Sequence, residues 1–164
     1  ANVALLSSAE KTHVVMQPNR PKRLAALGDI DANIVLNPGW TEGMAASIRA
    51  GMAAISENCD AIIIALADMP DITADHFNRL MAGYAPADGR EICRALDENG
   101  VGGLPVLFGA RFFESLSDLK GDRGAREILE ISKAFVTDVQ TSGLGATTDL
   151  DSPQDWKTWR KGQK

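Results

Sequence analysis

The sequence predicts an α/β fold in which a mostly parallel sheet lies between two layers of helices. Apolar, β-branched runs alternate along the chain with segments whose apolar residues recur at helical spacing. The run at 61–66 is apolar at every position, which is typical of a strand covered by helices on both faces. With 164 residues the chain is long enough for a sizeable core. We therefore expect one domain that spans residues 1–164.

Start and stop residues predict the elements of the first third of the chain. Pro21 opens a short basic helix and Gly28 closes it. Met44, Ile48 and Met52 recur at helical spacing, so one face of their helix is expected to pack inward. The expected elements are the tail of a helix at 1–10, strands at 12–17 and 33–36, and helices at 21–27 and 44–57.

The remaining elements continue the same alternation. Thr73 is a candidate N-cap for a helix that reaches Tyr84, and Ser152-Pro153 is a cap followed by proline at the first helical position. The expected strands lie at 61–66, 91–95, 105–108 and 134–139, and the expected helices at 74–84, 110–116, 122–129 and from 153 onward.

Composition narrows the classes of partner and compartment. The formal net charge of −5 argues against a nucleic-acid polymer, which requires clustered Lys and Arg, but it is compatible with a single nucleotide. No apolar run is long enough to span a membrane and no secretion signal is recognisable. Two cysteines without metal-ligand spacing suit a reducing compartment, so the expected location is the cytoplasm.

Asp68 is the first candidate for chemistry. It follows the apolar run at 61–66, and ligands of open α/β sheets bind at the carboxyl ends of the strands. Mg²⁺ takes one or two carboxylates together with water and substrate phosphates, so an aspartate at this place suits it. The alternative is that Asp68 or Asp71 only caps the following helix.

Three further candidate segments lie at the starts of helices. Asp149 and Asp151 could complete a metal site or serve as turn and cap residues before the last helix. The segment from Asn37 to Gly51 enters a helix through glycines and so offers free backbone amides. Residues 121–126 carry two arginines at a helix start, which suits phosphate, although a solvated helix start with Asp122 as its cap explains them equally well. His13 and His76 are too isolated for a catalytic case, and both are expected at the surface or half-buried.

Five motifs in this order resemble the molybdenum-cofactor nucleotidyltransferases, above all the molybdopterin cytidylyltransferase branch, and domains of this kind fused behind a molybdopterin-binding domain. The motifs are NPGWTEGMAASIRAG, AIIIALADMPDIT, GGLPVLFGARFF, LKGDRGAREIL and TDLDSPQDW. The resemblance implies a Rossmann-like nucleotidyltransferase fold. It also implies Mg²⁺-dependent transfer of a nucleotidyl group, CMP in preference to GMP, from CTP or GTP to molybdopterin, with release of pyrophosphate.

The resemblance also implies roles for individual residues. Asp68 matches the catalytic aspartate that holds Mg²⁺, and Asp149 or Asp151 matches an acidic position of the metal site. The remaining matches are ligand-binding positions. Gly43, Met44 and Ser47 lie near the base and ribose, and Gly121, Asp122, Arg123 and Arg126 line the side of the molybdopterin.

Two departures from the family accompany the resemblance. The family's first strand and its glycine-rich triphosphate loop have no counterpart, so we expect residues before Ala1 in the natural protein, and an upstream molybdopterin-binding domain is compatible with this. Leu104 stands where relatives carry His or Asn. Both departures favour an alternative, a non-catalytic nucleotide- or molybdopterin-binding domain of the same fold. A nucleotide-sugar glycosyltransferase with Asp149-Leu150-Asp151 as its metal motif is a third interpretation.

Overall fold

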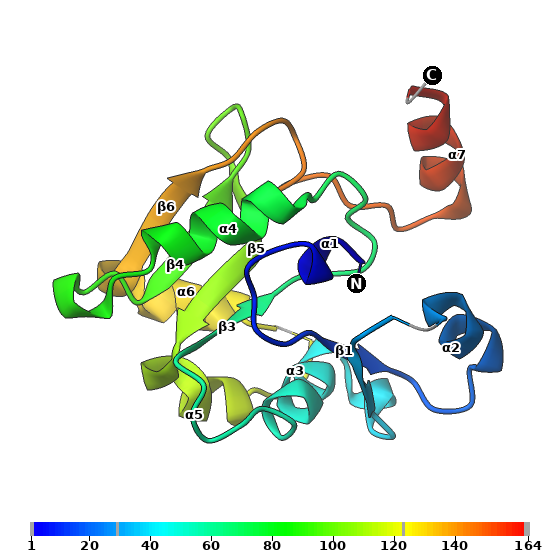
Figure 1. The fold of residues 1–164 in the computed structure, drawn as a ribbon, viewed down its shortest axis with the longest axis horizontal. Coiled ribbons are helices and arrows are strands. Elements are labelled where there is room, and N and C mark those ends of the chain that lie inside the picture. The colour runs from blue at the N-terminus through cyan, green and yellow to red at the C-terminus, as the bar shows by residue number, and fades with distance from the viewer. Residues whose placement is uncertain (1, 29, 123, 163–164) are drawn as a thin grey trace.

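The computed structural model describes residues 2–28, 30–122 and 124–162 of the chain. Strands and helices alternate along most of the chain, except that β5 follows β4 directly and α6 follows α5 (Figure 1). The strands are β1 (His13–Met16), β2 (Asn33–Leu36), β3 (Ala61–Ile64), β4 (Ile92–Leu96), β5 (Gly102–Gly109) and β6 (Val136–Gln140). The α-helices are α1 (Asn2–Leu5), α2 (Pro21–Leu27), α3 (Met44–Met52), α4 (Ala74–Gly83), α5 (Phe113–Ser117), α6 (Arg126–Ile131) and α7 (Pro153–Gly162). Short 3-10 turns η1 (Trp40–Glu42), η2 (Pro86–Asp88), η3 (Ala110–Phe112) and η4 (Lys133–Phe135) precede or join several of them.

The described strands form two separate sheets. The larger sheet has the order β3-β5-β4-β6, and the smaller one pairs β1 with β2 in parallel. In the larger sheet β4 and β6 are parallel, whereas β5 runs antiparallel to both β3 and β4. Three of its four strands therefore point the same way, and their carboxyl ends meet at one edge.

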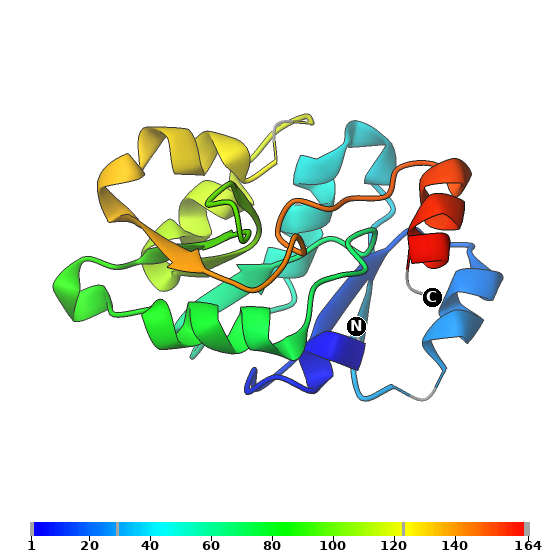
Figure 2. The same ribbon diagram turned by 90° about the horizontal axis from the view of Figure 1, so that it is seen from above.

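The larger sheet is covered on both faces, which makes the domain three-layered (Figures 1 and 2). On one face α3, α5 and α6 bury Met52, Leu116 and Ile128 against the sheet. On the other face α4 buries Leu80 against Cys93 and Leu107. Each face of the sheet therefore has its own hydrophobic cluster, one under α3, α5 and α6 and one under α4. Because successive strand residues point to opposite faces, neighbouring residues of one strand belong to different clusters.

Strand β3 illustrates why an uninterrupted apolar run was needed. Ile62 and Ile64 pack into the cluster under α3, while Ala61 and Ile63 pack into the cluster under α4. Helix α3 also reaches the smaller sheet, since a β-carbon on Gly51 would lie 3.3 Å from Val15 Cγ2 of β1. This helix therefore spans both sheets, and its start lies close to the edge where the strands end.

The structure confirms the α/β class and corrects several expected elements. The larger sheet is mixed, because 102–109 is an antiparallel strand that is longer than the 105–108 expected. The first helix ends at Leu5 instead of continuing to residue 10, and α3 ends at Met52 instead of residue 57. Residues 122, 124 and 125 lie in turns, and α6 begins only at Arg126. A turn there suits Gly124, whose φ is +55°.

Three smaller corrections concern element bounds. Residues 65 and 66 lie beyond the end of β3, β6 spans 136–140 instead of 134–139, and 110–112 is a 3-10 turn before α5. In the part of the chain that the structure describes, no helix is both long and apolar enough to cross a membrane.

Candidate functional site

Asp68 lies in the loop that follows β3, at the edge where the parallel strands of the larger sheet end. The residue is partly buried, and its Oδ1 atom is buried without a hydrogen-bond partner among the described residues. A buried carboxylate oxygen without a donor is costly unless a cation or another ligand satisfies it. This orphaned oxygen fits the proposed role of Asp68 as a ligand of a divalent cation.

The second acidic segment meets Asp68 through the backbone. The Leu150 amide donates a hydrogen bond of 3.0 Å to the carbonyl oxygen of Asp68. Leu150 is buried, whereas its neighbours Asp149 and Asp151 are exposed. The structure therefore brings together the two loops that the sequence singled out as acidic, with both flanking carboxylates free of the core.

No group of three or more His, Cys, Asp or Glu side chains among the described residues is arranged as a metal cluster. Asp68, Asp149 and Asp151 are therefore not assembled into a three-carboxylate site. Mg²⁺ needs only one or two protein carboxylates when substrate phosphates and water complete its octahedron. Asp68 with one carboxylate from the neighbouring loop matches that requirement.

A hydrogen-bond network around Asp97 holds the loop that leads to the second acidic segment. Asp97 is 3% exposed, and its Oδ1 accepts from the amides of Asn99 (2.9 Å) and Val101 (2.8 Å). Its Oδ2 accepts from the Thr147 hydroxyl at 2.8 Å. The Val101 amide is the main cause that lowers the pKa of Asp97 below its usual range, so it is ionised. Asp97 thereby anchors the loop at Thr147, two residues before Asp149.

The start of α3 packs against Gly121, Asp122 and Gly124. Gly43 has a φ of +113°, and a β-carbon on it would lie 1.9 Å from Asp122 Oδ1. The Ala45 amide donates to the Gly121 carbonyl at 3.1 Å. A β-carbon on Gly124 would lie 2.6 Å from Met44 Sδ. Two separate predicted ligand segments therefore form one surface, and only glycine permits their approach.

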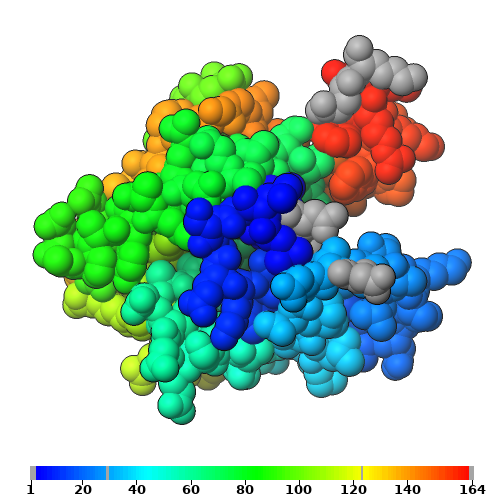
Figure 3. All heavy atoms as spheres, in the orientation of Figure 1, coloured from blue at the N-terminus to red at the C-terminus, as the bar shows by residue number. Residues whose placement is uncertain are grey.

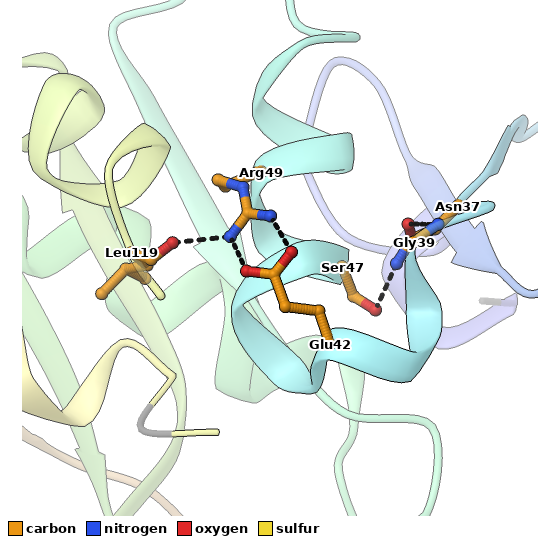
Figure 4. A network of polar contacts seen from close by, with 6 residues as sticks. All are labelled: Asn37, Gly39, Glu42, Ser47, Arg49 and Leu119. Carbon is orange, nitrogen blue, oxygen red and sulfur yellow. Dashed lines mark hydrogen bonds and ion pairs between the residues drawn. The ribbon is translucent and has the colours of Figure 1, made fainter. Parts of the chain in front are cut away.

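Two groups of polar contacts, one around Arg49 and one around Asn37, stabilise this end of α3 (Figure 4). Arg49 forms a bidentate pair with Glu42, with N–O distances of 2.9 and 2.6 Å, and also donates to the Leu119 carbonyl. The hydrogen bond from Arg49 lowers the pKa of Glu42. The buried side chain of Asn37 donates to Ser47 Oγ at 3.1 Å and accepts from the Gly39 amide at 2.9 Å. The loop from Asn37 to Gly43 is thus held in one shape.

The two arginines of the 121–126 motif differ from the other predicted residues. Arg123 lies outside the residues that the structure describes. The Arg126 side chain is 85% exposed and forms an ion pair with Glu130 one turn along α6. No contact in the described residues joins Arg126 to Gly43, Met44 or Asp68, so its expected role at the ligand remains a prediction.

The sequence alone assigns no role to the side chains of Asn37 and Asp97. In both cases the side chain accepts a hydrogen bond from the amide two residues later: Asn37 from Gly39, and Asp97 from Asn99. Asn and Asp are the residue types that form such turns. The residue type therefore predicts a turn. The further bonds to Ser47 and Thr147 depend on tertiary contacts.

The histidine expectation is wrong for His76. This residue is 1% exposed, and its Nδ1 meets the Thr73 amide at 3.2 Å in a capping box at the start of α4. Burial lowers its pKa, so the ring is neutral near pH 7. Leu104, the position where the resemblance led us to expect His or Asn, is partly buried and packs on two core clusters.

Comparison with curated proteins identifies two relatives. The purine catabolism protein PucB of Bacillus subtilis (strain 168) is 32% identical over 122 residues, which are 73% of this chain and 57% of PucB. The chain therefore spans less than two thirds of the length of PucB. The nicotine blue oxidoreductase of Paenarthrobacter nicotinovorans is 28% identical over 158 residues, which cover 93% of this chain and 76% of that protein.

Comparison with solved structures confirms the nucleotidyltransferase-like fold. Rv0371c from Mycobacterium tuberculosis H37Rv, crystallised in complex with manganese, superposes with a TM-score of 0.78 at 20% identity. The match covers 96% of this chain and 81% of Rv0371c. The family model described as the MobA-like NTP transferase domain matches residues 2–139, which is most of the chain. The chain therefore belongs to the MobA-like NTP transferase domain family, and it is an enzyme domain of the nucleotidyltransferase type.

Proposed function

We propose that this domain transfers a nucleotidyl group, CMP in preference to GMP, from a nucleoside triphosphate to molybdopterin. The observation that carries the proposal is the buried, unpartnered Oδ1 of Asp68 at the carboxyl end of β3, next to the loop with Asp149 and Asp151. Membership of the MobA-like family supports the reaction type. The preference for CTP rests on the five motifs that resemble the cytidylyltransferase branch.

In this reaction a terminal phosphate oxygen of the acceptor attacks the α-phosphorus of the triphosphate. The bond from that phosphorus to the β-phosphate bridging oxygen breaks, and pyrophosphate leaves with its electron pair. The acceptor phosphate is its own nucleophile, so no side chain has to form a covalent intermediate. Positioning and neutralisation of charge supply most of the acceleration in such transfers.

Two surfaces of this chain would take part, one that holds the metal and one that binds the nucleoside and the molybdopterin. Asp68, with Asp149 or Asp151, would hold Mg²⁺, which neutralises phosphate charge and orients the triphosphate. The manganese in the complex of the fold neighbour Rv0371c supports the use of a divalent cation. Gly43, Met44 and Ser47 would lie against the base and ribose, and the adjacent turn at Gly121 and Asp122 against the molybdopterin.

The proposal includes the cytoplasm as location and leaves room for an upstream molybdopterin-binding domain. The non-catalytic alternative keeps a specific observation in its favour. Leu104 packs into the core clusters and brings no hydrogen-bonding side chain to the position where relatives have one. Under that alternative the domain binds nucleotide or molybdopterin but releases no pyrophosphate.

The decisive experiment measures pyrophosphate release from CTP and from GTP in the presence of molybdopterin and Mg²⁺. One relative is named an oxidoreductase, and a redox reaction by itself releases no pyrophosphate. The assay therefore measures pyrophosphate directly. Asp68→Asn keeps the size of the side chain and removes its charge, and we expect activity to fall about 100-fold or more. Asp60→Asn is the matched control, because Asp60 is exposed and lies at the opposite end of β3.

Three results separate the interpretations. Pyrophosphate release that depends on Asp68 but not on Asp60 supports the proposal. Nucleotide binding without pyrophosphate release, measured by calorimetry, supports the non-catalytic alternative. A rise in melting temperature that is selective for UDP-sugars over CTP and GTP supports the glycosyltransferase interpretation and overturns the proposal.

A further inference from the structure

A hollow beside the candidate site lies along α7. Three kinds of group line it: an indole, two cations and the polar start of the helix. The lining residues are Asp151, Ser152, Pro153, Trp156, Lys157 and Arg160. In the space-filling view α7 projects at one corner of the molecule (Figure 3), so ligand can reach the helix from solvent.

Two hydrogen bonds tie this hollow to the loop of Asp68. Trp159 Nε1 on α7 donates to Asp71 Oδ1 at 2.9 Å, and the Leu150 amide donates to the Asp68 carbonyl. The start of α7 is itself capped, because the Ser152 amide donates to Asp155 Oδ2 at 2.8 Å. The hollow therefore has a defined position beside the loop that carries the proposed metal ligand.

The chemistry of the lining suits a flat anion. The Trp156 ring is partly buried and packs edge-on against Trp159, with ring centroids 6.0 Å apart. Arg160 lies 5.9 Å from the Trp156 centroid. Within the described residues neither Lys157 nor Arg160 forms an ion pair, although the whole chain is acidic. Indole faces stack on heteroaromatic rings, and Lys and Arg bind phosphate.

We propose that this hollow binds the acceptor substrate, a phosphorylated heteroaromatic molecule, with its ring on Trp156 and its phosphate on Lys157 and Arg160. The inference rests on the proposed function. It assigns the ring and the phosphate of the acceptor to α7 and leaves the rest of the molybdopterin to the turn at Gly121 and Asp122. It leaves the triphosphate to the separate surface at the start of α3. Asp151 lies in the wall of the hollow and in the second acidic loop, so a phosphate held there lies beside the proposed metal ligands.

The test is calorimetric titration of the full chain with hydroxymethylpterin phosphate, and separately with CTP and Mg²⁺. The variants are Trp156→Leu, which removes the ring, Trp156→Phe, which keeps one, and the pair Lys157→Gln with Arg160→Gln. Lys161→Gln is the matched control, since Lys161 is an exposed cation of the same helix that does not line the hollow. Melting temperatures establish that each variant is folded.

We expect Trp156→Leu to weaken binding of the pterin phosphate about tenfold, Trp156→Phe to restore most of it, and the double charge variant to weaken it by a similar factor. CTP binding should be unchanged in all of them. Wild-type binding of CTP without binding of the pterin phosphate would overturn this inference while leaving the proposed function intact. Loss of CTP binding in Trp156→Leu would also overturn it, because the hollow would then belong to the donor. If the wild type binds neither CTP nor the pterin phosphate, the proposed function is overturned as well.

Discussion

The amide of Leu150 donates a 3.0 Å hydrogen bond to the carbonyl oxygen of Asp68. This bond joins the loop after β3 to the loop before α7, and it places Asp149 and Asp151 on either side of a residue fixed to Asp68. Backbone bonds of this kind set the position of a loop without using the side chains. The carboxylates of Asp68, Asp149 and Asp151 therefore take no part in the bond that joins the two loops.

The hydrogen bond from Thr147 to Asp97 positions the second acidic loop, so we expect Mn²⁺ binding to depend on it. Thr147→Val should weaken Mn²⁺ binding about tenfold, because it removes the hydroxyl that fixes the loop two residues before Asp149. Calorimetric titration with Mn²⁺ measures the effect. Thr147→Ser should restore affinity, since serine supplies the same donor.

Thr148→Val is the control for this prediction, because the Thr148 hydroxyl bonds only the nearby Leu144 carbonyl, at 2.9 Å. Equal Mn²⁺ affinity in the Thr147 and Thr148 valine variants would show that the Asp97 network does not position the metal ligands.

Gly43→Ala tests the close approach of α3 to the turn at Asp122. The added methyl group would meet Asp122 Oδ1 at 1.9 Å and the Gly121 carbonyl at 3.0 Å, at a φ of +113° that L-residues rarely adopt. We expect a loss of about 1–3 kcal/mol in the free energy of unfolding, measured by urea denaturation, together with weaker binding of CTP.

Gly28→Ala is the matched comparison, since Gly28 also has a positive φ, +56°, but nothing lies within 4 Å of its β-carbon position. Its loss should come from backbone strain alone and be smaller than the loss in Gly43→Ala, with CTP affinity unchanged. If the two alanine variants lose the same free energy of unfolding and bind CTP with the same affinity, the close approach of Gly43 to Asp122 contributes neither to stability nor to CTP binding.

His76 predicts a pH dependence of stability. Burial lowers the pKa of His76 in the folded state, so the unfolded chain takes up its proton first as the pH falls. This contribution is complete at pH values above the ordinary histidine pKa of about 6.5 and is lost as the pH falls from there through the folded pKa. Urea denaturation between pH 7 and pH 5 should show the decline.

His76→Gln provides the comparison, because glutamine also suits the third helical position of the capping box with Thr73. Its free energy of unfolding should change less across the same pH range. An identical decline in both proteins would assign the pH dependence to other groups.

Local patterns in the sequence were enough to predict most elements and both halves of the candidate site. Pro21 and Gly28 predicted the bounds of α2, and the apolar run before Asp68 predicted a strand buried on both faces. These features succeed because capping, proline geometry and burial are encoded in neighbouring residues. The direction of β5 could not be predicted in the same way, since an apolar strand has the same pattern in either direction.

The sequence by itself determined the α/β class, the family and the set of candidate residues, because these depend on periodicity and on motifs in a set order. Only the tertiary structure decided which candidates meet. It joined Asp68 to Leu150, packed Gly43 on Asp122 and buried His76, and it left Arg126 paired with Glu130 on the surface. The physical reason is that these contacts join loops distant in the chain, and their positions depend on how the helices pack on the sheet.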